Sequence, residues 1–209
     1  MRIIPAIITT AVTISLCYAF SHKLGQIPPL GNLLSPQTGF WQNAEPIGEF
    51  PHEQVSLPGL SAKTEVWYDD RMVPHIFAEN EADAYYVQGY VTARDRLWQM
   101  ELQTLAAAGR LSEILGPKLV QYDRQQRRLG MVYAAEGTVK AMLADPVTKT
   151  AVTSYAAGIN AYIATLTPAT LPVEYKILDY KPEKWDIIKS ALLLKYMAHD
   201  LAGFCDDLE

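Results

Sequence analysis

Apolar residues recur at helical spacing over a long central stretch, residues 80–108. At 100° per residue they fall in two adjacent stripes that together cover more than half of the circumference. One stripe contains Tyr86, Tyr90, Ala93, Leu97, Met100, Thr104 and Ala108, and the other contains Val87, Val91, Trp98, Leu102 and Leu105. A surface helix needs an apolar face of only about 100°, so we expect this helix to be largely buried. Gly89 lies in mid-helix at a cost of about 1 kcal/mol relative to alanine, which indicates close packing of another backbone.

The stretch VTARDRLWQME, residues 91–101, adds a cluster of polar side chains to the same helix. Asp95, Arg96 and Gln99 lie on the remaining polar face, whereas Arg94 and Glu101 fall inside the apolar arc. Buried charges are costly unless they are paired, so we expect Arg94 and Glu101 to have partners. A solvated polar edge and an edge that meets another protein segment both fit this pattern.

Ahead of this helix the pattern changes to that of a β-hairpin, residues 63–79. KTEVWYDD contains consecutive β-forming residues, DDRM supplies the turn and VPHIFA is the return strand. Pro74 fits at the start or edge of a strand, and His75 is expected to be a packing residue of the hairpin. The predicted class is therefore α+β and mostly helical.

Capping residues mark the ends of the predicted helices. Asn80 is the expected N-cap of the central helix and Gly109 ends it. GRLSEILGP predicts a short helix, and helical patterns resume at 118–128, 131–144 and 145–166. The last of these has Asp145 as its expected cap and Pro146 at its first position. Residues 168–185 are expected to be an irregular or partly extended connection. After the cap Asp186, the final helix has one apolar face, which consists of Ile187, Ala191, Leu194, Ala198 and Leu201.

The N-terminal region has a different composition from the rest. Residues 3–20 are uncharged over 18 positions, near the lower limit for crossing a bilayer. Residues 1–23 fit both a secretory signal peptide, cleaved after Ala19, and a retained membrane anchor. Either would export the remaining chain, to the periplasm or to the outer side of a membrane. The Pro- and Gly-rich residues 24–62 predict a linker along a surface, with Phe40 and Trp41 as anchoring points.

Charge and cysteine content exclude several classes of site. The net charge is −5 and the 18 Lys and Arg residues are dispersed, so nucleic acid is not an expected partner. Cys17 lies in the apolar leader and is not expected to pair with Cys205. Without metal-type Cys/His spacing or a phosphate-binding glycine loop, neither a zinc site nor an organic cofactor is expected. The chain ends on GFCDDLE, shortly after an apolar helix, and we expect a fragment or a subunit.

Several of these segments together resemble a known family. WYDDRMVPHIFAENEADAYYVQGYVTARDRLWQMELQTLAAAGRLSEILG, followed by YDRQQRRLG, YAAGINAYI and LPVEYKILDYKPEKWD, resembles the penicillin acylase (penicillin amidase) family of N-terminal nucleophile hydrolases. The resemblance covers residues 63–209. One departure is Met72, at a position where the family commonly has glycine.

The resemblance implies a precursor that cleaves itself into α and β chains. The new N-terminal serine of the β chain would be the nucleophile, with its own α-amino group as base. This chain resembles the N-terminal part of the α chain only, so no catalytic residue is expected within it and the missing β chain is its expected partner. The β chain would complete an αββα fold. Ser112 and Ser154 are expected to be ordinary helix or cap residues.

The resemblance also implies two kinds of binding residue near the end of the chain. Met197 and Leu201 match α-chain positions that line the acyl pocket for a small amide substrate, although ordinary core packing fits them equally. Asp200 replaces an arginine found in some relatives, which implies a different acyl preference. Asp207 matches a calcium-binding carboxylate, although a solvated acidic cluster fits it too. Calcium needs about six to eight oxygens, so this chain alone cannot complete that site.

Two functions remain open at this stage. The first is the α-chain portion of an exported amidohydrolase that cleaves linear amides, such as a penicillin side chain or an N-acyl-homoserine lactone, through a serine acyl-enzyme. The second is a non-catalytic, membrane-tethered helical module that binds another partner through its apolar faces. In the first, Arg94, Asp95, Arg96, Gln99 and Glu101 organise the helical core and dock the β chain.

Overall fold

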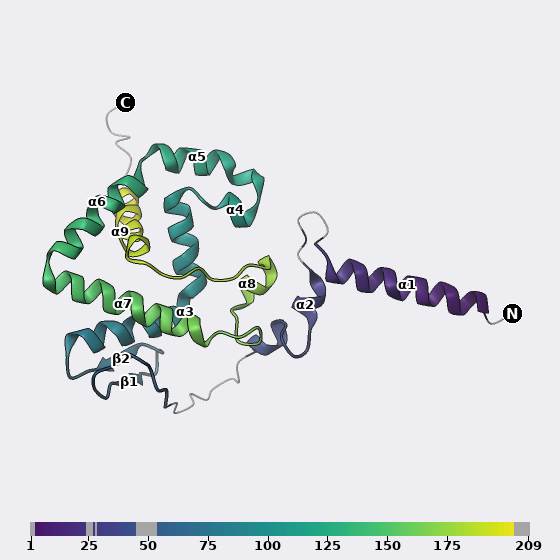
Figure 1. The fold of residues 1–209 in the computed structure, drawn as a ribbon, viewed down its shortest axis with the longest axis horizontal. Helices are drawn as coiled ribbons and strands as arrows, with labels where there is room; N and C mark the ends of the chain where they lie inside the picture. Colours follow the sequence, from purple (N-terminus) through teal and green to yellow (C-terminus); the bar gives the residue numbers. More distant parts are fainter. Residues whose placement is uncertain (1–2, 24–26, 28, 45–53, 203–209) are drawn as a thin grey trace. The chain divides into compact units, whose positions relative to one another are not determined.

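The computed structural model describes residues 3–23, 27, 29–44 and 54–202, and these form helices and one two-stranded antiparallel sheet (Figure 1). They divide into two compact units. One unit comprises the described residues of 1–52 together with Leu166–Lys181, and the other those of 53–165 and 182–209. This division differs from the predicted boundary between a linker at 24–62 and a domain at 63–209.

The first unit contains α1 (Ile3–Ser21), α2 (Leu30–Leu34), the 3-10 helix η1 (Phe40–Asn43) and α8 (Val173–Leu178). Short helices thus form where a linker was expected. Trp41 is exposed and only Phe40 is partly buried, with the two rings 4.3 Å apart. The prediction of an irregular connection at 168–185 was wrong over α8. That helix starts directly after Pro172, whose fixed φ suits a helix start.

The hairpin of the second unit consists of β1 (Glu65–Tyr68) and β2 (Pro74–Phe77), as predicted. The strands pair antiparallel, with Trp67 opposite His75 and Glu65 opposite Phe77. Because side chains alternate across a strand, these four residues share the outer face. His75 is exposed there, 3.5 Å from the Asp69 carboxylate, so its predicted packing role was wrong. The inner face contacts the start of α3 through Val66, Tyr68 and Ile76.

The hairpin turn keeps a tight geometry although it lacks glycine. The Asp69 Oδ1 atom accepts hydrogen bonds from the N–H groups of Arg71 and Val73, at 2.9 and 2.8 Å. Met72 has φ of 64°, in the left-handed region that favours glycine. The departure from the family pattern therefore retains the turn but puts a strained methionine in it.

α3 (Glu81–Ala108) is the long central helix, and the caps confine it to the predicted range. The Asn80 side chain accepts the Asp83 N–H, and Gly109 ends the helix with φ of 65°. Most of its predicted apolar stripes are buried. Arg96, with φ of −145° and ψ of 23°, interrupts the helix, and the sequence pattern did not predict this kink. The kink divides α3 into two halves that pack in different clusters.

Shorter helices complete the second unit. The halves of α3 contribute to two clusters, one with the hairpin and one with α6 and α9. The remaining elements are α4 (Ser112–Leu115), η2 (Pro117–Leu119), α5 (Val120–Arg128), α6 (Met131–Ala144), α7 (Pro146–Thr165) and α9 (Ile187–Leu201). Two predicted caps are present, because the Asp145 and Asp186 side chains accept the N–H groups of Thr148 and Lys189. The predicted helices at 118–128, 131–144 and 145–166 are thereby confirmed within a residue or two at each end.

Among the described elements, α3 and α7 make the most extensive contact (Figure 1). A Cβ atom added to Gly89 would lie 3.0 Å from the Tyr155 carbonyl carbon. A Cβ atom added to Gly158 would lie 2.8 Å from the Tyr86 carbonyl carbon and 2.9 Å from the Tyr90 nitrogen. The close backbone packing predicted for Gly89 is confirmed, and Gly158 is its counterpart on the other helix.

α9 buries only part of the predicted face, of which Ala191 is buried. Lys189, Ala191 and Leu192 are its buried residues, and Ile188 and Tyr196 pack beside them. Leu194, Ala198 and Leu201, which were assigned to the inner stripe, are exposed. The first half of α9 contacts the core, and Tyr196 extends that contact, whereas Leu194, Met197, Ala198 and Leu201 are exposed.

Candidate functional site

The second half of α9 carries the two predicted substrate-binding residues. Met197 and Leu201 are four residues apart on the same helix and are 57% and 78% exposed. Leu194, one turn earlier, is 51% exposed. Ordinary core packing therefore does not explain these side chains within the described part of the chain. The substrate-binding role of Met197 and Leu201 remains a prediction, as does the calcium role of Asp207, which lies outside the described residues.

The polar stretch of α3 forms an exposed edge around the kink. Arg94, Asp95, Arg96 and Gln99 are all exposed. Arg94 has the partners expected of it but is exposed, because its long side chain reaches past the apolar arc. Its guanidinium donates a hydrogen bond to the Tyr68 hydroxyl, lies over the Tyr68 ring at 5.3 Å and is 3.5 Å from the Asp95 carboxylate. Arg94 thus links α3 to the hairpin.

Glu101 is buried and paired, as its position in the apolar arc predicted. It is 1% exposed, and its Oε1 atom accepts the Glu183 N–H at 2.9 Å. The Lys189 ammonium, itself nearly buried, lies 3.5 Å from the same oxygen and 3.1 Å from the Glu183 carboxylate. Glu101 therefore joins α3 to the segment that leads into α9.

Further charges extend this network towards α4. The Arg110 guanidinium donates to the Glu183 carboxylate at 2.8 Å and to the Glu113 carboxylate at 2.8 Å. The hydrogen bonds from Arg110, followed by that from Lys189, lower the pKa of Glu183 to about 2. The pairing of opposite charges makes this network a structural tie between segments rather than a set of groups poised for proton transfer.

Sequence reasoning missed most members of this network. Lys189 follows the α9 cap at a position that looks like a surface lysine, and Arg110 and Glu183 are 73 positions apart. Asp123 was also missed, although its carboxylate accepts the Leu111 and Ser112 N–H groups at 2.9 and 2.8 Å. The available signal was the set of unpaired N–H groups at the start of α4, which require an acceptor.

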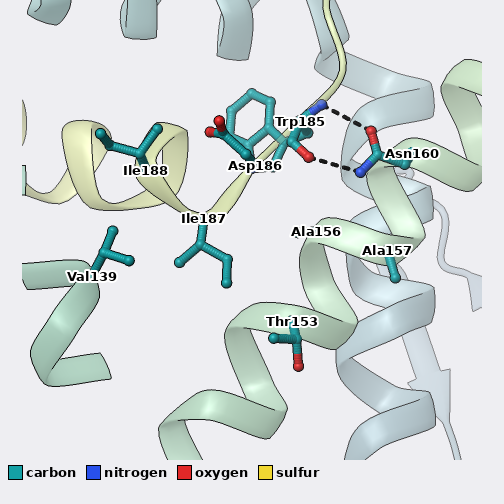
Figure 2. A pocket seen from close by; sticks show the side chains of 9 residues that line it. All are labelled: Val139, Thr153, Ala156, Ala157, Asn160, Trp185, Asp186, Ile187 and Ile188. Atoms are coloured by element: carbon teal, nitrogen blue, oxygen red, sulfur yellow. Dashed lines mark hydrogen bonds between the residues drawn. The ribbon is translucent and has the colours of Figure 1, made fainter. Parts of the chain in front are cut away.

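An open depression of about 600 Å³ lies between α6, α7 and the start of α9. Figure 2 shows that the Asn160 side chain turns to the backbone of Trp185, where it both donates and accepts at 2.8 Å. The remaining lining is largely apolar, with Val139, Ile187 and Ile188 on one side. Thr153 and Asp186 also line the depression, but the Thr153 hydroxyl donates to the Lys149 carbonyl at 2.7 Å and the Asp186 carboxylate accepts the Lys189 N–H. All three polar side chains of the lining therefore bind backbone groups.

The described residues contain no cluster of three or more His, Cys, Asp and Glu side chains suited to a metal ion. Ser112 is in α4, with its N–H bound to Asp123, and Ser154 is in α7. These positions agree with the expectation that they are helix residues. The features that remain are an exposed apolar surface on α9 and an exposed polar edge on α3.

The comparisons with known proteins place this arrangement in a family. The model of the family described as penicillin amidase matches residues 63–209, and the chain belongs to this family. The chain is 43% identical over 132 residues to the penicillin acylase 2 proenzyme of Pseudomonas sp. (strain SE83), which covers 63% of this chain and 16% of that protein. It is 31% identical over 145 residues to penicillin G acylase of Escherichia coli, covering 66% of this chain and 17% of that protein.

Two further similarities extend the comparison. The acyl-homoserine lactone acylase QuiP of Pseudomonas syringae pv. syringae is 34% identical over 155 residues, covering 74% of this chain and 18% of that protein. A solved structure of thermostable penicillin G acylase from Alcaligenes faecalis matches with a TM-score of 0.62 and 28% identity, covering 70% of this chain and 77% of that chain. The mostly helical fold with its two-stranded sheet is similar to that structure. The chain spans less than a fifth of the length of these curated relatives.

Proposed function

We propose that this chain is the N-terminal α-chain portion of an exported amidohydrolase. The observation that carries the proposal is the family match over residues 63–209, supported by the similarity to penicillin acylases and acyl-homoserine lactone acylases. The match to this protein covers 16% of the Pseudomonas proenzyme but 77% of the matched chain in the solved acylase structure. The matched chain in that structure is therefore far shorter than the proenzyme. This difference supports a precursor that is divided into chains.

In the proposed reaction, a serine outside this chain attacks the carbonyl carbon of a linear amide. The amine leaves with a proton, and water then hydrolyses the acyl-serine ester to release the acid. Residues 63–209 act as scaffold and pocket wall, within an αββα fold that the β chain completes. The precursor cleaves itself to free the serine's α-amino group as the base.

Met197 and Leu201 form part of the wall for the acyl group. Their exposure on the second half of α9 supports this role, because the free faces of both side chains offer apolar surface to a ligand or to the β chain. Asp200 lies between them in sequence and adds a negative charge where some relatives have arginine. We expect this replacement to disfavour acyl groups that carry a carboxylate.

The exposed edge of α3 is the proposed contact for the β chain. Asp95, Arg96 and Gln99 present charge and amide groups beside the kink, and polar groups of this kind set the register of a docked partner more than its affinity. Arg94 and Glu101 organise the helical core instead. Arg94 fixes α3 to the hairpin, and Glu101 fixes it to the segment that leads into α9.

Calcium is a further part of the proposal. Asp207 would supply one carboxylate, and the remaining oxygens would come from outside this chain. The ion would be structural. Calcium content of the complete enzyme by elemental analysis, before and after dialysis against a chelator, tests this assignment, with a thermal midpoint that falls on chelation as the expected result.

Expression of the complete precursor, with acylase assays on both substrate classes, tests the proposed function. We expect hydrolysis of a phenylacetyl amide, of an acyl-homoserine lactone, or of both. Met197→Ala and Leu201→Ala should each change kcat/KM by about tenfold, since each removes roughly 1–2 kcal/mol of apolar contact. Val147→Ala, which truncates a similarly exposed residue of α7, is the matched control.

The non-catalytic module predicts a different outcome. A complete gene product that hydrolyses neither substrate class, and that contains no serine released at a new N-terminus, would favour the module. The family match over the helical region favours the hydrolase.

A further inference from the structure

α1 has the length and surface of a bilayer-spanning helix. It is the one described helix that is long and apolar enough to cross a membrane, and none of its residues is buried. Nineteen residues at 1.5 Å each span about 28 Å, close to the hydrocarbon thickness of a bilayer. The Thr9 and Thr13 hydroxyls donate to helix carbonyls at 3.0 and 2.9 Å, so these polar groups are paired within the helix. A signal sequence shares these properties, so the residues that follow must decide between the two.

α2, which is outside the apolar run, contacts the C-terminal end of α1. A Cβ atom added to Gly31 would lie 3.1 Å from the Phe20 carbonyl oxygen and 3.7 Å from the Phe20 Cβ atom. A contact of 3.1 Å is tighter than most real Cβ contacts, so glycine eases the close approach of α2 to α1. The first turns after the apolar helix therefore fold back on it instead of leading away as an open segment.

The next residues are bound to a segment far along the chain. The Lys176 ammonium, on α8, donates to the Gly39 carbonyl at 3.0 Å, to the Asn43 side-chain oxygen at 2.7 Å and to the Ala169 carbonyl at 2.9 Å. The Asn43 amide in turn donates to the Leu171 carbonyl at 3.0 Å. We call residues 30–43 with 166–178 the clamp. Its bonds to a charged donor are of the stronger kind.

The clamp is also folded within itself. The Gly39 N–H donates to the Ser35 carbonyl at 2.7 Å, and the Gln42 side-chain amide donates to the Pro36 carbonyl at 2.7 Å. These contacts give the segment after α1 a fixed conformation.

We propose that α1 remains in the mature protein as a membrane anchor and that the clamp joins it to residues 166–178 at the bilayer surface. The partner is the lipid bilayer itself. Small residues at alternate positions before Ala19 and Ser21 fit the cleavage site of a signal peptide. Cleavage after either residue would remove the part of α1 that α2 contacts. The inference concerns location and does not depend on the reaction.

Membrane extraction of the complete protein tests the anchor. We expect the protein to stay in the pellet after alkaline carbonate washing, and mass analysis of its mature N-terminal chain to include residues 3–21. Ala19→Leu and Ser21→Leu, which block leader cleavage, should leave both mass and fractionation unchanged. A soluble mature chain that begins at Phe20 or His22 would overturn the proposal, even if amide hydrolysis is intact.

Limited proteolysis of the membrane-bound protein tests the clamp. Chymotrypsin should cut after Phe40 or Trp41 about tenfold faster in Lys176→Met than in the wild type, because three oxygen acceptors lose their charged donor. Lys181→Met removes an exposed lysine of the same unit and is the control, with no expected change. Equal cleavage rates for Lys176→Met and the wild type would rule out the clamp.

Discussion

Replacement of Gly158 by alanine should destabilise the chain strongly, because the added methyl group has no room between α7 and α3. The new Cβ atom would lie 2.8 Å from the Tyr86 carbonyl carbon and 2.9 Å from the Tyr90 nitrogen, whereas ordinary Cβ contacts are 3.4–4 Å. Both neighbours are backbone atoms of α3 and cannot rotate away. The two helices must therefore separate by roughly 1 Å, and a gap of that size forfeits a quarter to a half of each dispersion contact along the interface.

This separation costs about 3 kcal/mol, at the upper end of the usual range for an overpacked core. For a chain of this length, that free energy corresponds to a fall in the thermal midpoint of about 6–12 °C. Circular dichroism of the full chain in detergent micelles measures it. Gly137→Ala is the matched control, since a Cβ atom there meets nothing within 4 Å and α6 gains helix propensity, for about 0.5–1 kcal/mol of stabilisation.

The facing glycine of α3 provides an internal check. Gly89→Ala strains the same interface from the other side, so its effect should not add fully to that of Gly158→Ala. If Gly158→Ala unfolds at or above the temperature of the wild type, the close approach of α3 and α7 is refuted.

Three further predictions concern the turn, the acid stability and the polar edge. Met72→Gly relieves the left-handed φ of 64° and should stabilise the chain by about 1 kcal/mol, measured as a higher thermal midpoint; a lower midpoint would show that the turn is not strained. The pKa values of Asp83 and Glu183 are lowered to about 2, the former by hydrogen bonds from Ser61, so the stability they add is present above their unfolded pKa and is lost as the pH falls from about 4 towards 2. Asp83→Asn should flatten that loss in a pH series of thermal midpoints, and a fall as steep as in the wild type would contradict the assignment. Arg96→Ala should impair maturation of the complete precursor, as seen by the ratio of precursor to cleaved chains; a correctly cleaved variant with a selective loss of turnover would instead place Arg96 in the active site.

Local features of the fold could be predicted from the sequence because their causes are local. Asn80 and Asp186 have side chains that accept helix N–H groups three residues later, and both helices begin there. Glu101 was recognised as a paired buried charge since it falls inside an apolar arc. Gly89 was recognised as a contact point because glycine in mid-helix requires compensation.

Features that depend on distant partners could not be predicted. The stripe that begins at Ile187 and a neighbouring stripe of α9 are both apolar, and the positions of α3 and α6 decide that Leu192 is buried while Leu194 is exposed. Arg94 fell inside the apolar arc, but the flexibility of its side chain lets it reach Tyr68. Lys176 binds oxygens more than 130 positions away, and no pattern near it indicates this.

The same limit applies to the proposed site. The positions of Met197 and Leu201 came from the family resemblance, and the structure adds that both side chains are exposed. Helical periodicity alone assigned Leu201 to the core. In the structure, these residues stand out because they are apolar and exposed near the end of a helix. In the sequence, only the resemblance to the family singles them out.

Amide hydrolysis by residues 1–209 alone, beside the complete precursor product, tests the proposed division of roles most directly. Both are assayed with a phenylacetyl amide and an acyl-homoserine lactone, by release of the amine. We expect that residues 1–209 release amine no faster than buffer and that the complete product is active. Turnover by residues 1–209 alone would contradict the proposed function, because the nucleophile would then lie within this chain.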